Sequence, residues 1–397
     1  MGDLRDVLER AAEGYRPRRD QWDRTMTRAR HRERRRRMAA GSLAMLVAVA
    51  GLAGAVVAFR ARGVPRSLAT SAATAHSSPP HAPEVHVVKD RTLRLGQLGG
   101  LVAAEDAFGS VWAVLITDGG EELVRADPFT GSIDHRFPLS YFPAHEWGGQ
   151  GLAVGDGALW VAGADTGHDH ATVTRIDPAS NAQVAIPIEG HAVVDVAFDS
   201  GTLWALVSQS TPHQSNVVEI DPATNGIVSS TGFDADWSGG IVAADGDAWT
   251  IERDVQGSTV AGGRLVQIVP GGPSPVTLGG SFALPVSDGI SIWAPYLGDS
   301  QAMNMAGSIA RIDPRTGDVL DEWPTDAIGY DLAVGPDGGI WFLSGDRLSR
   351  LNTSTGETDV KVAAHGQPIF LVPTDGAIWV GTYGGELVRF SVKDVAS

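Results

Sequence analysis

Seven tryptophans recur in nearly the same short phrase along most of the chain, and this repeat restricts the fold more than any other feature. Each lies inside a short apolar run, as in GALWVA (157–162) and GGIWFL (338–343). Successive copies are 38 to 48 residues apart, a period typical of propeller blades and too long for short solenoid repeats. The repeated residues are Trp112, Trp160, Trp204, Trp249, Trp293, Trp341 and Trp379.

Each repeat translates into four strands. A short apolar run such as LAVG (152–155) precedes a tight turn such as Asp156-Gly157, and Asp-Gly between apolar runs is a strong hairpin signal. The tryptophan strand follows, and a third strand ends in an Ile-Asp-Pro phrase, as in RIDPASN (175–181), where Pro fixes φ and Asn or Gly tolerates the left-handed position. A fourth strand such as QVAIPI (183–188) completes the unit. The sequence therefore predicts an all-β, seven-bladed β-propeller of four-stranded antiparallel blades over residues 86–397.

The seventh repeat is one strand short. It ends in RFSV (389–392) without the turn and the fourth strand that follow in the other repeats. An unassigned strand-like run, HVVKDRTLRL (86–95), precedes the first repeat. We expect this N-terminal strand to complete the last blade and to close the ring.

The seven tryptophans are interpreted as structural residues. A large ring at one fixed point of every blade is best placed between adjacent blades, where it buries a large apolar area. They are therefore assigned to the core and not to a binding site.

The repeats resemble known propeller families. The phrase GYDLAVGPDGGIWFLSG (329–345) resembles blades of the streptogramin (virginiamycin B) lyases, and the Ile-Asp-Pro phrases resemble the YncE-like, quinoprotein-like propellers. The lyases follow Trp-Phe-Thr with a glutamate and use a histidine and a glutamate with a divalent metal. Here Leu343 and Ser344 follow Trp341-Phe342, and only Glu252 comes close to that pattern. The resemblance therefore predicts the fold, because propellers host binding, scaffolding and catalysis alike.

The N-terminal part predicts a membrane anchor. No residue from Met38 to Phe59 is charged, and this stretch of 22 residues matches the roughly 20 that a membrane-spanning helix needs. The arginine-rich run RHRERRRR (30–37) precedes it, so the N-terminus is expected in the cytoplasm and the propeller outside. A cleaved signal peptide is the alternative, but its apolar region is normally shorter. The expected parts are a cytoplasmic, Arg-rich helical tail (1–37), the transmembrane helix (38–59) and a Pro/Ala/Ser-rich linker (60–85).

Charge is distributed unevenly over these parts. Residues 1–66 carry 16 Arg against 7 acidic residues, whereas residues 67–397 carry 15 basic residues against 40 acidic ones, so the net charges are +9 and −25. An outer domain with that excess of acid repels phosphate, so nucleic acid is excluded as its partner. The chain has no cysteine, which excludes disulfides and Cys-ligated metal sites.

Candidate ligand-binding residues gather on one predicted face. Loops between successive blades share that face with loops between the second and third strands of each blade, and six of the 11 histidines fall on it. Histidine with carboxylates suits a polar ligand, a divalent metal or acid–base work, but solvated loops also collect polar residues. No residue is assigned as catalytic or metal-ligating, and no cofactor is predicted. The candidates are His145, Glu146, His168, Asp169, His170, His191, His213, Glu252, Tyr330, Asp331, His365 and Tyr383.

The favoured function is a membrane-anchored, extracytoplasmic module that binds a ligand or a protein. One alternative is a lyase- or hydrolase-like enzyme that uses a funnel lined by histidine and acid. The other is a membrane-bound regulator that resembles the anti-sigma factors of actinobacteria and acts on a cytoplasmic protein through residues 1–37, although the chain lacks the cysteines of their zinc motif. The lipid bilayer is the remaining expected partner, because the arginine cluster can also hold the tail on anionic lipid.

Overall fold

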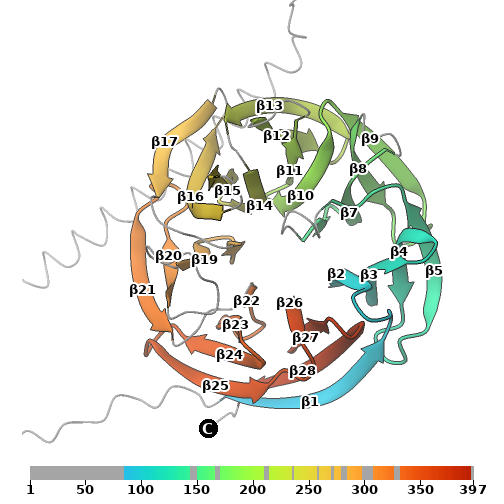
Figure 1. Cartoon of the computed structure of the whole chain (residues 1–397), viewed down its shortest axis with the longest axis vertical. Helices are drawn as coiled ribbons and strands as arrows, with labels where there is room; N and C mark the ends of the chain where they lie inside the picture. The colour runs from blue at the N-terminus through green and yellow to red at the C-terminus, as the bar shows by residue number, and fades with distance from the viewer. Residues whose placement is uncertain are drawn as a thin grey trace, which may run out of the picture. The chain divides into compact units, whose positions relative to one another are not determined.

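The computed structural model is a closed ring of seven four-stranded antiparallel sheets around a central axis (Figure 1). It describes residues 85–143, 150–165, 170–209, 214–234, 237–256, 259–269, 272–278, 284–296, 307–325 and 331–394. The predicted seven-bladed β-propeller is thereby confirmed. Within these residues no helix is long and apolar enough to cross a membrane, and the predicted helix at 38–59 lies outside them.

Each blade is a meander whose first strand lies nearest the axis and whose last strand lies on the rim (Figure 1). Blade 1 contains β2 (Leu101–Ala107), β3 (Ser110–Thr117), β4 (Gly120–Ala126) and β5 (Ile133–Leu139); blade 2 contains β6 (Leu152–Gly155), β7 (Ala158–Ala164), β8 (Ala171–Ile176) and β9 (Gln183–Ile188). Blade 3 contains β10 (Ala192–Asp199), β11 (Thr202–Ser208), β12 (Gln214–Asp221) and β13 (Gly226–Asp234); blade 4 contains β14 (Trp237–Ala244), β15 (Asp247–Gln256), β16 (Thr259–Val269) and β17 (Gly272–Leu278). Blade 5 contains β18 (Val286–Ser287), β19 (Ile292–Tyr296), β20 (Gly307–Ile312) and β21 (Val319–Thr325); blade 6 contains β22 (Leu332–Val334), β23 (Ile340–Ser344), β24 (Arg347–Asn352) and β25 (Glu357–Ala363). Blade 7 contains β26 (Pro368–Thr374), β27 (Ala377–Thr382), β28 (Glu386–Asp394) and, from the other end of the domain, β1 (Val85–Arg94).

Blade 7 closes the ring with the N-terminal strand, as the sequence predicts. β1 pairs antiparallel with β28, from Val85 opposite Asp394 to Arg94 opposite Glu386. In Figure 1 the blue strand β1 continues the red blade along the rim. Closure pairs both edges of this blade's C-terminal strand and thereby joins the two ends of the described domain in one sheet.

The core consists of seven apolar clusters, and each lies between one blade and the next. One tryptophan takes part in every cluster: Trp112, for example, packs with Leu159 and Val161 of blade 2. Trp379 of blade 7 packs with Ala104 and Ala113 of blade 1 in the same way. The repeat therefore fixes how blades pack on each other and not only how each blade folds.

A cation covers the tryptophan in most blades. The strand register sets an arginine directly opposite the tryptophan, as with Arg125 opposite Trp112, and four such guanidinium groups lie 5.5–5.9 Å from the ring centroids. Arg125 also donates hydrogen bonds to the Pro178 carbonyl and to Asn181 in blade 2. The Ile-Asp-Pro turn is thus both a turn and a docking point for the preceding blade.

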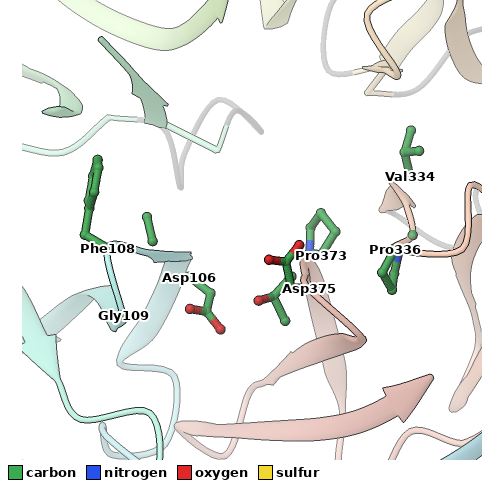
Figure 2. Close-up of a pocket in the computed structure, with 10 residues that line it drawn as sticks. Asp106, Phe108, Gly109, Val334, Pro336, Pro373 and Asp375 are labelled. Atoms are coloured by element: carbon green, nitrogen blue, oxygen red, sulfur yellow. The ribbon is translucent and has the colours of Figure 1, made fainter. Parts of the chain in front are cut away.

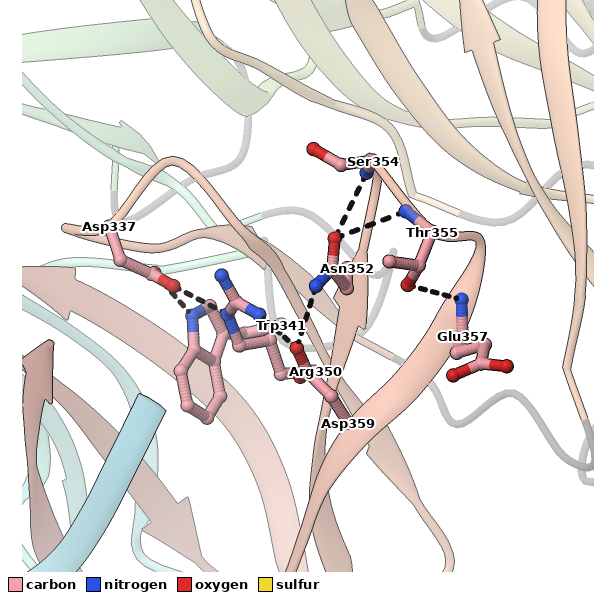
Figure 3. Close-up of polar contacts among 8 residues, drawn as sticks. All are labelled: Asp337, Trp341, Arg350, Asn352, Ser354, Thr355, Glu357 and Asp359. Atoms are coloured by element: carbon pink, nitrogen blue, oxygen red, sulfur yellow. Dashed lines mark hydrogen bonds and ion pairs between the residues drawn. The ribbon is translucent and has the colours of Figure 1, made fainter. Parts of the chain in front are cut away.

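Blade 6 has a polar variant of this arrangement (Figure 3). Asp337 accepts hydrogen bonds from Nε1 of Trp341 at 2.9 Å and from Nε of the buried Arg350, whose Nη1 reaches Asp359. Asn352 donates to the same carboxylate of Asp359 at 3.1 Å. Because the buried Arg350 and Asn352 both have partners, this network stabilises the blade.

Candidate functional site

The two ends of the propeller differ in how the strands are joined. At one end, called the turn end here, short turns such as Asp156-Gly157 join first to second strands and Asp-Pro turns join third to fourth strands. At the other end, called the loop end, lie the connections between blades and between second and third strands, and these vary widely in length. Variable loops on a rigid scaffold are the usual place for binding residues, so the loop end is the candidate site.

Six of the candidate residues lie in the described part of the chain, and the strand directions place all six at or near the loop end: His170, His191, Glu252, Asp331, His365 and Tyr383. The other six lie outside the described residues: His145, Glu146, His168, Asp169, His213 and Tyr330. The assignment of the whole set to a ligand stays a prediction.

The described side chains differ in availability. His170 and His365 are exposed, and His365 has a left-handed backbone with φ of 60°. Tyr383 is 46% exposed and its ring covers Gly99, where a Cβ would meet the ring at 3.3 Å. Glu252 is held by Arg264 at 2.8 Å, so its carboxylate is occupied by an ion pair. Of the six described candidates, His170, His365 and Tyr383 are therefore the exposed ones, while His191 is half-buried.

Asp331 has a structural role. It is buried, and its carboxylate accepts the amide hydrogens of Leu332 in its own blade and of Leu371 in blade 7. It also accepts Nε2 of Gln150 at 3.3 Å from blade 2, on another part of the ring. Burial raises the pKa of Asp331 to about 7, although the hydrogen bonds favour the ionised form.

Asp195 occupies the same place in blade 3, and sequence reasoning missed it. Its carboxylate accepts the amides of Gly151 in blade 2 and Val196 in its own blade, at 2.8 and 2.9 Å, and that of Ile241 in blade 4 at 2.9 Å. Burial raises its pKa to about 6. The signal was available, because Asp195 and Asp331 each begin the run that leads into the first hairpin of a blade.

These two carboxylates line the channel along the axis. A cavity of about 300 Å³ runs past the first strands of blades 2 to 6 and is bounded by Gln150, Asp195 and Asp331 toward the loop end and by Asp199 and Ser287 toward the turn end. The carboxylate oxygens of Asp195 and Asp331 accept hydrogen bonds from main-chain amides and so hold neighbouring blades together. They are therefore poorly placed to act as a general base.

No group of three or more His, Asp and Glu side chains could hold a metal ion among the residues that the structure describes. The described part of the loop end thus presents separate polar and aromatic side chains on a scaffold.

Comparison with known proteins supports the fold alone. No family model and no curated protein matches the chain. The solved structures that are similar to it include virginiamycin B lyase from Staphylococcus aureus, at 12% identity and a TM-score of 0.55, over 78% of this chain and 99% of that chain. The WD40 β-propeller domain of Doa1 is similar at 14% identity and a TM-score of 0.52, over 77% and 97% of the two chains. Hydrazine synthase of Kuenenia stuttgartiensis is similar at 13% identity and a TM-score of 0.55, over 75% and 96%. At such identities these chains share the propeller architecture, on which many functions occur.

Proposed function

We propose that the chain is a binding module, anchored in a membrane by residues 38–59, that presents the loop end of its propeller to an extracytoplasmic ligand or protein. One observation carries the proposal. The irregular connections of all seven blades gather at one end of a ring whose blades are tied together by buried contacts.

The chemistry of the loop end favours binding over catalysis. The acids that burial perturbs there, Asp195 and Asp331, are saturated with hydrogen bonds from the scaffold. The accessible side chains His170, His365 and Tyr383 offer hydrogen bonds and an aromatic surface, which suit recognition of a polar or aromatic group. Binding by such a surface requires no preformed acid–base pair.

The binding surface can be tested by chemical cross-linking in cells that produce the full chain. We expect cross-linked partners to be recovered with the natural chain and lost with the double variant His365→Asn, Tyr383→Ala. Asn suits the left-handed φ of position 365, so the variant should fold. The control is Val184→Ala on β9, a rim position that is 42% exposed. The same partners with all three proteins would refute a loop-end site.

The anchor can be tested independently. We expect the full chain to stay in the membrane fraction after carbonate washing, with a C-terminal epitope that protease reaches in intact cells. Placing two arginines in the apolar run, Leu46→Arg with Val49→Arg, should release it, because a charge at the centre of a span costs about 2.5–3.5 kcal/mol on insertion scales. A natural chain found wholly in the soluble fraction would contradict the anchor.

A further inference from the structure

The turn end contains a second cavity, which is larger than the one in the channel. It has a volume of about 560 Å³ and is lined by the first hairpins of three neighbouring blades, at 106–109, 334–336 and 373–375. Figure 2 shows Phe108 on one side of it, Pro336 and Pro373 on the other, and the carboxylates of Asp106 and Asp375 between them. This pocket is at the opposite end from the loop-end residues.

Phe108 is an unusual residue at its position. It occupies the left-handed position of a hairpin turn, with φ of 56°, and is 44% exposed. The corresponding positions of blades 2, 3 and 4 hold Asp156, Ser200 and Asp245, with φ of 51°, 50° and 51°. A left-handed backbone is unfavourable for a residue with a Cβ atom, and Asn and Asp tolerate it best. The ring of Phe108 is partly exposed to solvent, so it neither favours the turn nor packs in the core.

The pocket is negatively charged. Asp375 is exposed and has no hydrogen bond or ion pair with any residue that the structure describes, and no Lys, Arg or His lines the cavity. Asp106 accepts Nε1 of Trp379 with one carboxylate oxygen at 2.9 Å, which leaves the other oxygen for a second donor. Glu105, next to Asp106, contributes little charge at neutral pH, because burial first and the Asp106 charge second raise its pKa to about 8.

Negative charge continues around the mouth of the channel. The first hairpin of every blade carries an aspartate at the turn end: Asp106, Asp156, Asp199, Asp245, Asp288, Asp337 and Asp375. Asp156 and Asp245 are exposed like Asp375, whereas Asp288 and Asp337 are held by hydrogen bonds to nearby tryptophans. The field of such a ring raises the local concentration of cationic groups at this end.

We propose that this pocket binds an arginine side chain of a basic polypeptide, with the guanidinium against the ring of Phe108 and hydrogen-bonded to Asp375. A guanidinium can stack on an aromatic face and donate to a carboxylate with its edge at the same time. The chain already uses half of this geometry at the same end, where the Arg91 guanidinium carbon lies 4.7 Å from the centroid of Phe129. The pocket exceeds the volume of one side chain, so neighbouring residues of the bound segment have room beside the two prolines. This site is independent of the proposed loop-end function.

The test is fluorescence anisotropy with the full chain and a labelled, end-blocked peptide of alternating glycine and arginine. We expect binding that weakens about tenfold or more in Phe108→Asn and in Asp375→Asn. Asn tolerates the left-handed φ of position 108, and at both positions it would precede a glycine in a favourable Asn-Gly hairpin turn, so both variants should fold. Asp156→Asn removes the same charge from a turn of blade 2 outside the pocket, and there we expect less than a twofold change.

A peptide with citrulline in place of arginine keeps the shape but lacks the charge, and it should not bind. Equal losses in Asp375→Asn and Asp156→Asn would show general attraction to an acidic surface and overturn the proposal. Binding of the citrulline peptide, or no binding of the arginine peptide, would overturn it as well. Melting temperatures at or above the natural value would confirm that the variants fold, and the loop-end cross-linking experiment should give the same result with each of them.

Discussion

Replacing Leu93 by alanine tests whether the N-terminal strand contributes to the stability of the closed ring. Leu93 lies on β1, is 2% exposed, and packs in the cluster that joins blade 7 to blade 1, with Val124, Phe370 and Trp379. Truncating a buried leucine removes its transfer free energy and leaves a cavity, at a total cost of about 2–5 kcal/mol. The contacts come from both blades, so we expect a value near the middle of that range, about 3 kcal/mol.

The expected change in melting temperature follows from the size of the cooperative unit. Globular proteins gain about 2.1 cal/mol/K of unfolding entropy per residue, so a domain of about 310 residues gains roughly 0.65 kcal/mol/K. A loss of about 3 kcal/mol then lowers the melting temperature by about 5 °C. Val88→Ala is the matched control on the same strand, because Val88 is 56% exposed, and it should change the melting temperature by less than about 1 °C.

The assay is thermal unfolding of the full chain followed by tryptophan fluorescence and by far-ultraviolet circular dichroism. Equal melting temperatures for Leu93→Ala and the natural chain would show that β1 does not belong to the cooperative unit and would refute ring closure as a source of stability. Deleting residues 86–95 is the stronger form of the test. We expect that chain to lose its cooperative transition, and unfolding at an unchanged temperature would contradict closure by this strand.

Further predictions concern the core and the buried acids. Trp249→Phe should cost about 1 kcal/mol more stability than Trp204→Phe in chemical denaturation. The reason is that Nε1 of Trp249 donates to the Pro314 carbonyl at 3.1 Å, whereas the buried Nε1 of Trp204 has no partner among the residues that the structure describes; equal costs would contradict this. Because the pKa of Asp331 is raised, its contribution to stability is complete below pH 3.8 and is lost as the pH rises through about 7. Between pH 4 and 8 the free energy of unfolding of the natural chain should therefore fall, relative to that of Asp331→Asn, by an amount on the order of 3 kcal/mol. Parallel curves for the two chains would refute the burial argument. Hydrogen bonds from the Ser180 amide and hydroxyl lower the pKa of Asp177, so the contribution of Asp177 to stability is present above pH 3.8 and is lost as the pH falls through the lowered pKa. Asp177→Ala should therefore lower the denaturant midpoint more at pH 7 than at pH 2.

The blade architecture was predictable because each of its signals is local. Asp156-Gly157 marks a hairpin within a few residues of Trp160, and the Asp-Pro turn at 177–178 marks the next one. The structure extends the same turn to Phe108-Gly109 and Ser200-Gly201, where the sequence signal is weaker. Ring closure was predictable for a different reason, since one strand was missing at one end of the repeats and one was in excess at the other.

Contacts between blades were not predictable from such signals. Gln150 and Asp331 are 181 positions apart and meet only because the blades form a ring of fixed size. The assignment of Asp331 to a ligand illustrates the difficulty. Its residue type makes it a candidate for binding, but its main-chain partner, the amide of Leu371, belongs to another blade and gives no signal near it in the sequence. The charge of the turn end was equally hidden, because its aspartates look like ordinary turn residues when each blade is considered alone.

The direction of β1 connects the two ends to the rest of the chain. Val85 pairs with Asp394 and Arg94 with Glu386, and Gly99 bonds to Tyr383 in a loop-end connection, so β1 runs from the turn end to the loop end. Whatever precedes Val85 is therefore attached to the propeller at the turn end. If residues 38–59 anchor the chain, the tether joins the propeller through the rim strand β1 at the turn end, and the accessible His365 and Tyr383 lie at the end away from the attachment point. A binding module held in this way keeps its variable loops free for a ligand, while the acidic pocket lies at the end where the tether joins.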